Sequence, residues 1–327
     1  MLLQITISFT VSFVITLVVG LLLIPALRRM KAGQMIQEDG PVWHKGKQGT
    51  PTMGGLMFIA GITITCFTVG LGEIREGRLG HVTVIAFALV FAAIGFFDDY
   101  VKLKRKQNLG LKAKEKFALQ LLVAIGYVAI MHLLGNLTTN LYIPFVDISI
   151  QIPTPIYYVF ASFVILGTVN SVNITDGVDG LVTGVTIPVA ACILCLAFYL
   201  GHTTVGILAA ALLGGLISFL LFNFHPAKIF MGDTGSLFLG GAICALAFAM
   251  DMPMLLIVLG LVYILEALSD IIQVTYFKLS KGKRVFKMAP IHHHFEMCGW
   301  SEYKIFTVFT LASTLFALIS FLGVYNR

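Results

Sequence analysis

Four stretches of this sequence combine acids, amides and histidines at the ends of long apolar segments. They are "FFDDYVK" (96–102), "NSVNITDGVDG" (170–180), "NFHPAKIFMGDTGS" (223–236) and "APIHHHFE" (289–296). Polar side chains next to an apolar run of membrane length are costly to place, so they often mark a functional site. We therefore begin with the chemistry that these residues could perform.

Carboxylates dominate the first and third stretches. Asp98 and Asp99 are adjacent, and Asp233 precedes a "TGS" turn. Paired carboxylates suit a hard divalent cation such as Mg²⁺, which prefers oxygen ligands and shares them with substrate phosphates. Two structural interpretations compete: Asp98 and Asp99 as a solvated helix end balanced by nearby lysines, and Asp233 as a helix N-cap. The glycines around Asp233 would also let backbone N–H groups approach an anion.

The second stretch places Asn170, Asn173, Asp176 and Asp179 three residues apart. If this stretch is helical, all four side chains share one face. The alternative is a turn, because "TDGVDG" is also typical of a segment in which Asp and Gly stabilise the backbone locally. Amides beside carboxylates suit the recognition of hydroxyls and the edge of a heterocycle.

The third and fourth stretches also offer Phe230 and the histidines at 292–294. Phe230 could stack on a base, although a Phe at the end of a span is more often an interface anchor. Three adjacent histidines cannot all face one zinc ion in a regular element. In an extended loop His292 and His294 would share a side, where they could contact phosphate; a surface tract without a role is the alternative.

Six lysines follow Asp98 and Asp99 closely, and five of them are candidates here, at positions 102, 106, 112, 114 and 116. A polyphosphate substrate needs such cations, so Lys102 and Lys106 are candidate substrate contacts. The pattern as a whole predicts a magnesium–phosphate site at a lipid boundary.

The elements that must position these residues are membrane helices. Of the 327 residues, 58% are hydrophobic and 12% charged, which is typical of a polytopic membrane protein. Apolar runs long enough to cross a bilayer predict an all-α fold of about ten transmembrane helices, in one domain over residues 1–327. The predicted spans are 3–27, 51–70, 80–98, 117–135, 155–171, 181–200, 204–222, 236–250, 254–277 and 303–325.

The distribution of basic residues predicts the orientation. With both termini outside the cytoplasm, all 22 Lys and Arg except Arg75, Arg78 and Arg327 fall on the inner side. The four polar stretches then meet at the cytoplasmic face and predict an active-site cleft there. The segment 136–155 alternates β-formers and predicts a short outer hairpin. Membrane topology and anionic lipid explain the net charge of +6 better than nucleic acid does.

Together the four stretches resemble the polyprenyl-phosphate sugar-1-phosphate transferases. The His triplet, with "GTPTMGG" at 49–55, resembles the phospho-N-acetylmuramoyl-pentapeptide transferases in particular, and the resemblance covers most of the chain. It implies a reaction of UDP-MurNAc-pentapeptide with undecaprenyl phosphate that gives lipid I and UMP and requires Mg²⁺. It also implies a homodimer in the bacterial inner membrane.

By the same resemblance, Asp98, Asp99 and Asp233 are the catalytic aspartates, with Asp233 the most direct metal ligand, and His292 is a further catalytic candidate. Positions near the nucleoside are Asn173, Asp176, Asp179 and Phe230, the last against the uracil. Positions lining the nucleotide-sugar pocket are Lys47, Thr52, Asn223, Gln273, Ala289, His292 and His293. Asn170, Lys102, Lys106 and His294 complete the expected substrate contacts.

Two alternatives stay open. A related transferase that uses UDP-GlcNAc would share the aspartates. An ion-coupled transporter would explain Glu266 and Asp270, which lie within the predicted ninth span. We interpret these two acids instead as part of a ninth helix that bends toward the site. Transporter sites usually lie near the bilayer midplane, however, whereas the acids here cluster at one edge.

Overall fold

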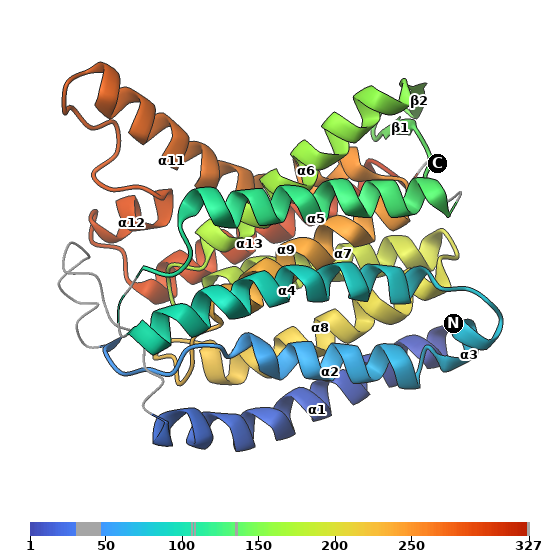
Figure 1. The fold of residues 1–327 in the computed structure, drawn as a ribbon, viewed down its shortest axis with the longest axis horizontal. Helices are drawn as coiled ribbons and strands as arrows, with labels where there is room; N and C mark the ends of the chain where they lie inside the picture. Colours follow the sequence, from blue (N-terminus) through green and yellow to red (C-terminus); the bar gives the residue numbers. More distant parts are fainter. Residues whose placement is uncertain (31–46, 106, 108, 135–136, 326–327) are drawn as a thin grey trace.

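The computed structural model describes residues 1–30, 47–105, 107, 109–134 and 137–325, and nearly all of these residues are helical or connect helices (Figure 1). The longer helices are α1 (Leu2–Arg29), α2 (Gly55–Thr68), α4 (Gly80–Arg105), α5 (Ala113–Leu133), α6 (Thr154–Thr175), α7 (Leu181–Tyr199), α8 (Thr203–Asn223), α9 (Gly232–Ala249), α11 (Leu261–Leu279) and α13 (Glu302–Leu322). The shorter ones are α3 (Leu71–Arg75), the 3-10 turn η2 (Pro253–Leu255), α10 (Leu256–Leu259) and α12 (Ile291–Glu296).

Eight helices of the described chain are long and apolar enough to cross a membrane, and a bent pair raises the number to nine. That pair consists of residues 253–259 and α11, which meet at an angle of 77°. Helix α2 is apolar but has only 14 residues. A polytopic helical membrane protein is therefore confirmed, while two of the ten predicted spans correspond to a broken helix and a short one.

The helices differ in how much of their surface faces other helices. In the most apolar part of α7, α8 and α9, 72%, 72% and 78% of the residues are buried within the protein, against 28%, 22% and 28% in α1, α5 and α13. Helices α7, α8 and α9 therefore form the interior of the bundle. Helices α1, α5 and α13 expose large apolar side chains such as Leu22, Leu122 and Leu311, as expected for helices that face lipid.

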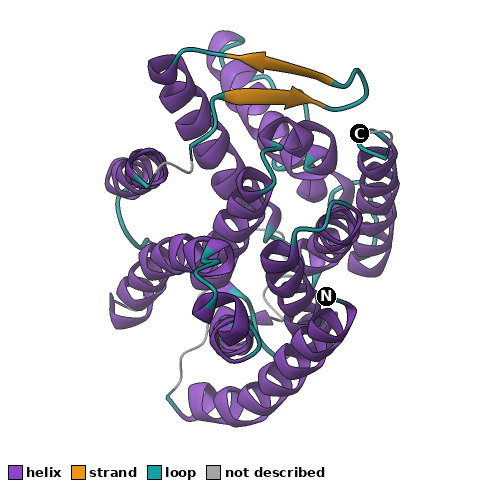
Figure 2. Cartoon of the chain, turned by 90° about the vertical axis from the view of Figure 1, so that its right-hand side faces the viewer, coloured by secondary structure: helices purple, strands orange, loops and turns teal. Residues whose placement is uncertain are grey.

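The predicted hairpin is confirmed. Strand β1 (Asn140–Ile143) pairs antiparallel with β2 (Ile148–Gln151), and Asn140 lies opposite Gln151. The turn between them is fixed to the end of α13 by a hydrogen bond from Phe145 N–H to the Gly323 carbonyl at 2.8 Å. The hairpin lies at the same end of the bundle as the start of α1 and the end of α13, whereas α12 lies at the opposite end (Figures 1 and 2).

Two helices approach each other unusually closely at that opposite end. A Cβ added to Gly95 of α4 would lie only 2.1 Å from the carbonyl oxygen of Asp233, in the first turn of α9. Only glycine permits this distance without moving one helix. The approach brings the final turns of α4, which carry Asp98 and Asp99, beside the first turn of α9.

Candidate active site

Asp98, Asp99 and Asp233 form one cluster, which we call the aspartate cluster. Each residue contributes a carboxylate oxygen, and these oxygens all lie within 4.8 Å of one another. Asp98 and Asp99 are buried at the end of α4, and Asp233 is the second residue of α9. The sequence prediction that these three acids meet is confirmed.

Asp99 has a structural task in addition to its place in the cluster. Its carboxylate accepts hydrogen bonds from the backbone N–H groups of Asp233 (3.1 Å) and Thr234 (2.9 Å) and from the Thr234 hydroxyl (2.6 Å). These donors belong to the first turn of α9, whose N–H groups have no partner within the helix. Asp99 therefore caps α9 from a neighbouring helix, a role that sequence reasoning had considered for Asp233.

Two lysines offset part of the negative charge of the aspartate cluster. Lys102 Nζ lies 2.6 Å from Asp98 and 2.9 Å from Asp233, and Lys116 Nζ lies 2.8 Å from Asp233. Lys102 was an expected contact, and Lys116 was one of five lysines that the sequence could not rank. Lys106, the other expected contact, lies outside the described residues.

Asn173 extends the cluster along α6. Its Nδ2 donates to Asp233 Oδ1 at 2.9 Å and to Ser236 Oγ at 2.8 Å. Asn170, one turn earlier, donates instead to Gln120 of α5 and to the Leu166 carbonyl, both at 2.8 Å. The structure thus brings Asn173 to the aspartate cluster, whereas the described contacts of Asn170 join α5 to α6.

The helix that contains both asparagines ends at Thr175, so Asp176 and Asp179 do not continue its face. The helical interpretation of all four residues was wrong, because the two glycines of "TDGVDG" favour the turn. Asp176 still lies near the aspartate cluster. Burial, reinforced by the carboxylates of Asp233, Asp99 and Asp179, raises the pKa of Asp176 to about 8.

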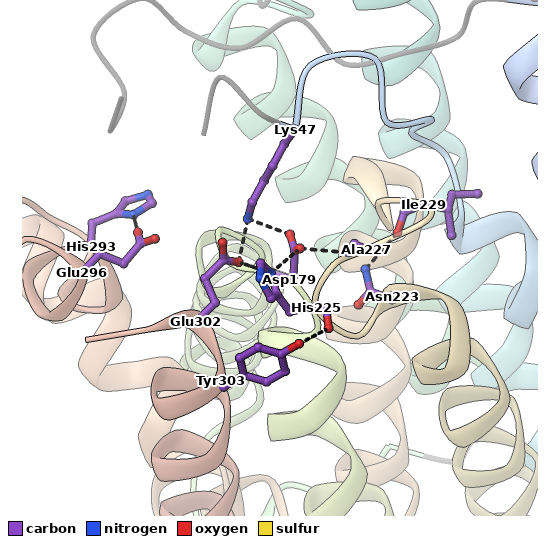
Figure 3. Close-up of polar contacts among 10 residues, drawn as sticks. All are labelled: Lys47, Asp179, Asn223, His225, Ala227, Ile229, His293, Glu296, Glu302 and Tyr303. Carbon is purple, nitrogen blue, oxygen red and sulfur yellow. Dashed lines mark hydrogen bonds and ion pairs between the residues drawn. The ribbon is translucent and has the colours of Figure 1, made fainter. Parts of the chain in front are cut away.

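Asp179 belongs to a second group, the Lys47 cluster, made of Lys47, Asp179, His225 and Glu302 (Figure 3). Lys47 Nζ lies 2.7 Å from Asp179 Oδ1 and 2.6 Å from Glu302 Oε2. The other Asp179 oxygen is 3.0 Å from His225 Nδ1 and accepts a 3.0 Å hydrogen bond from Ala227 N–H. Glu302 was not predicted as a site residue, because a single acid after Ser301 in "WSEYK" is typical of the first turn of a helix.

Several expected pocket residues make contacts within the protein that shape nearby segments. Asn223 accepts from the Thr183 hydroxyl at 2.9 Å and donates to the Ile229 carbonyl at 3.0 Å. Gln273 Oε1 accepts from the N–H groups of residues 285 and 286 at 3.1 and 3.0 Å. The backbone of Phe230 bonds to Pro51 and Gly54 at 2.8 Å each. These contacts fix the 224–230 and 285–286 segments at the end of the bundle that holds the two clusters.

Two further expected residues border this region. Thr52 is buried, and its hydroxyl lies 2.9 Å from the point that a Cβ on Gly232 would occupy, next to Asp99. Ala289 is half-buried and precedes α12. Ala289 lies at the end of the bundle that holds the two clusters, and no described hydrogen bond or ion pair joins it to either of them.

The three histidines form helix α12, not an extended loop, so the expectation that His292 and His294 share a side was wrong. Buried His292 places Nδ1 2.9 Å from Glu266 Oε2 of α11, and a Cβ on Gly177 would lie 2.2 Å from its Nε2. His293 contacts Glu296 (Figure 3), and His294 accepts from Lys287 N–H at 3.1 Å. The three rings therefore have three different environments. Glu266, which lies within the predicted ninth span, forms an ion pair or hydrogen bond with His292.

The geometry defines a class of protein: a helical membrane protein whose acids and lysines meet at one end of the bundle. Residues 81–251 match the model of glycosyl transferase family 4, and residues 47–59 match a phospho-N-acetylmuramoyl-pentapeptide-transferase signature. The aspartate cluster lies within the first match, and Lys47 and Thr52 lie within the second.

Curated relatives match this chain in sequence over almost its whole length. Phospho-N-acetylmuramoyl-pentapeptide-transferases of Clostridium botulinum (strain Alaska E43 / Type E3) and Desulforamulus reducens are 45% and 46% identical over 314 and 312 residues, covering 94% of this chain and 92% of each relative. That of Staphylococcus aureus (strain MSSA476) is 43% identical over 307 residues, covering 93% of this chain and 94% of its own. The chain belongs to the phospho-N-acetylmuramoyl-pentapeptide transferase family.

Proposed function

We propose that this protein transfers phospho-MurNAc-pentapeptide from UDP-MurNAc-pentapeptide to undecaprenyl phosphate, giving lipid I and UMP. The observation that carries the proposal is the meeting of Asp98, Asp99 and Asp233 with two lysines in a chain of this family. An oxygen of the lipid phosphate forms a bond to the phosphorus that carries the sugar, and the bond from that phosphorus to UMP breaks. UMP leaves with the bonding electrons.

The donor set of the aspartate cluster fits Mg²⁺. Its three carboxylates offer only hard oxygen atoms, close enough together for one ion. Asp98 and Asp233 are the better ligands, because each has one oxygen that contacts only lysine side chains, which an ion can displace. Both Asp99 oxygens are instead held by backbone N–H groups of α9. When bound, Mg²⁺ would neutralise phosphate charge during the transfer.

The remaining chemistry falls to side chains of the chain itself. Lys102 and Lys116 hold Asp233 and supply positive charge where two phosphorylated substrates must approach each other. Asp98 accepts from Leu111 N–H at 2.7 Å and contacts Lys102, surroundings that suit a fixed anion better than a proton acceptor. A base is also less necessary, because a phosphate monoester with a second pKa near 6 is mostly dianionic at neutral pH.

The pH profile of Asp98→Asn tests that assignment. We expect activity to stay low at every pH, because the lost group organises charge. Recovery of activity as the pH rises through the pKa of the lipid phosphate would instead make Asp98 the base.

We further propose that the aspartate cluster faces the cytoplasm, with both termini outside, and that the protein forms a homodimer. Two observations support the orientation: the lysine-rich segments flank the aspartate cluster, and the start of α1, the end of α13 and the hairpin lie at the other end (Figure 1). Exposed Cys298, next to α12, should react with an impermeant maleimide in inverted membrane vesicles only. Native mass spectrometry in detergent tests the dimer.

The deciding experiment measures UMP release by the purified protein with undecaprenyl phosphate, with Mg²⁺ and then with chelator. We expect release from UDP-MurNAc-pentapeptide only, and only with Mg²⁺. Release from UDP-GlcNAc instead would overturn the substrate while keeping the reaction class. No release from either donor would overturn the proposal and direct attention to ion or solute uptake in liposomes.

A further inference from the structure

Glu302 connects a lipid-facing helix to the Lys47 cluster. It is the first residue of α13, after the N-cap Ser301, and its carboxylate is largely buried although most of α13 is exposed. One oxygen, Oε2, lies 2.6 Å from Lys47 Nζ and 3.4 Å from His225 Nδ1 and accepts from Asp179 N–H at 3.2 Å. A single carboxylate oxygen thus contacts three segments that are distant in the sequence.

Glu302 adds to the direct contacts that Asp179 makes with Lys47 and with His225. Lys47 reaches across from the segment before α2 and lies between the carboxylates of Asp179 and Glu302 (Figure 3). The 224–230 loop is fixed from the other side, because the hydroxyl of Tyr303 donates to the His225 carbonyl at 3.0 Å. The first turn of α13 therefore sets the spacing between Lys47 and the loop that joins α6 to α7.

The charges of the Lys47 cluster indicate what it can do. The single lysine faces two carboxylates, so its ammonium group is already neutralised. A neutralised lysine between fixed acceptors is suited to hydrogen bonding with an uncharged part of a ligand, because net positive charge for phosphate is lacking.

We propose that Glu302 is a positioning residue for the nucleotide-sugar donor: it holds Lys47 and Asp179 in the arrangement that binds an uncharged polar part of the donor. The proposal rests on the proposed function, because it assumes that the donor binds at this end of the bundle. It predicts that Glu302 contributes to donor binding and not to the transfer step.

The test compares Glu302→Gln with the wild-type protein in the UMP-release assay, varying each substrate in turn. Glutamine keeps the shape and can still accept from Asp179 N–H, but it loses the charge that fixes Lys47. We expect the KM for the nucleotide sugar to rise at least about fivefold, with kcat and the KM for undecaprenyl phosphate within about twofold of wild type. A fall in kcat with an unchanged donor KM would overturn the proposal.

Two further variants separate positioning from folding. Glu115→Gln removes the same charge from an exposed site on α5 and should leave both KM values unchanged. The polar contacts of Glu115 within the described part of the chain are with Lys112, whose Nζ lies at 3.7 Å and whose N–H donates at 3.4 Å, a bond that glutamine can still accept. Lys47→Met should reproduce the rise in donor KM, and adding Glu302→Gln to it should raise the KM no further. Additive effects of the two changes would show that Glu302 does not act through Lys47.

The wild-type protein distinguishes failure of the positioning proposal from failure of the proposed function. If wild type releases no UMP, the proposed function is wrong. If wild type is active and Glu302→Gln has the wild-type donor KM, only the positioning role is wrong.

Discussion

Replacing Asp99 with asparagine should destabilise the protein as well as slow the reaction. Asp99 accepts hydrogen bonds from two backbone N–H groups and one hydroxyl at the start of α9. Asparagine has one acceptor oxygen and one NH₂ group, so in either orientation the NH₂ group must face a donor of α9. The first turn of α9 would then lose part of its cap.

The structure sets the magnitude of this effect. A hydrogen bond to a charged group contributes roughly 1.5–3 kcal/mol, and a buried donor left without a partner costs about 1–3 kcal/mol. We therefore expect Asp99→Asn to lower the free energy of unfolding by about 2–4 kcal/mol. Asp98→Asn is the matched control: its oxygen can still accept from Leu111 N–H, and Lys102 keeps its 2.9 Å contact with Asp233, so we expect a smaller loss of stability.

Thermal unfolding in detergent with a thiol-reactive dye measures the difference, since Cys66, Cys192 and Cys244 are buried and become reactive on unfolding. The midpoint for Asp99→Asn should lie roughly 3–6 °C below that of wild type and clearly below that of Asp98→Asn. Both variants should lose transferase activity. If Asp99→Asn unfolds at or above the midpoint of Asp98→Asn, the capping role assigned to Asp99 is refuted.

Three further predictions concern the same end of the bundle. Gly95→Ala should lower activity about tenfold or more, because its methyl group would force α4 away from the Asp233 carbonyl. Overpacking of this kind costs about 1–3 kcal/mol. Wild-type kinetics in this variant would contradict the close approach of α4 and α9. Lys116→Gln should reduce kcat about tenfold, whereas Lys112→Gln, which alters an exposed lysine paired only with Glu115, should change it less than about twofold. The pKa of Asp176 is raised from 3.8 to about 8, so its contribution to stability is greatest at low pH and is lost as the pH rises toward 8. The free energy of unfolding of wild type relative to Asp176→Asn should therefore fall by about 1.4 kcal/mol per pH unit between pH 5 and 7. If the free energy of unfolding depends on pH in the same way in both proteins, the pKa of Asp176 is not raised.

The sequence predicted which residues meet but not which atoms they contact. Asp98, Asp99 and Asp233 could be placed together because each borders an apolar span on the same predicted side, a relation that hydropathy and basic residues reveal directly. The choice of Lys116 over Lys112 could not be predicted, since it depends on the rotation of α5 relative to α9. Helix rotation is set by packing between segments far apart in the chain.

Other differences have the same origin. Asn223 and Gln273 carry side chains suited to ligands, yet in the structure they bond to the backbone of neighbouring loops. Glu302 has no local pattern that marks it, and its partner Lys47 is 255 positions away. A bend in the ninth span was predicted from Glu266 and Asp270 and is confirmed, but its place at Gly260 and its angle of 77° were not predicted.

The burial of α9 and the exposure of its neighbours bear on how the protein responds to changes in bilayer thickness. The helix that carries Asp233 lies mostly inside the bundle, whereas α1, α5 and α13 form much of the outer boundary. Changes in bilayer thickness act on outer helices by altering their tilt, at a fraction of a kcal/mol per Å of mismatch. Two of these outer helices contact the clusters directly: α5 through Lys116, 2.8 Å from Asp233, and α13 through Glu302, 2.6 Å from Lys47. Bilayer thickness should accordingly affect both the rate of transfer and the affinity for the donor.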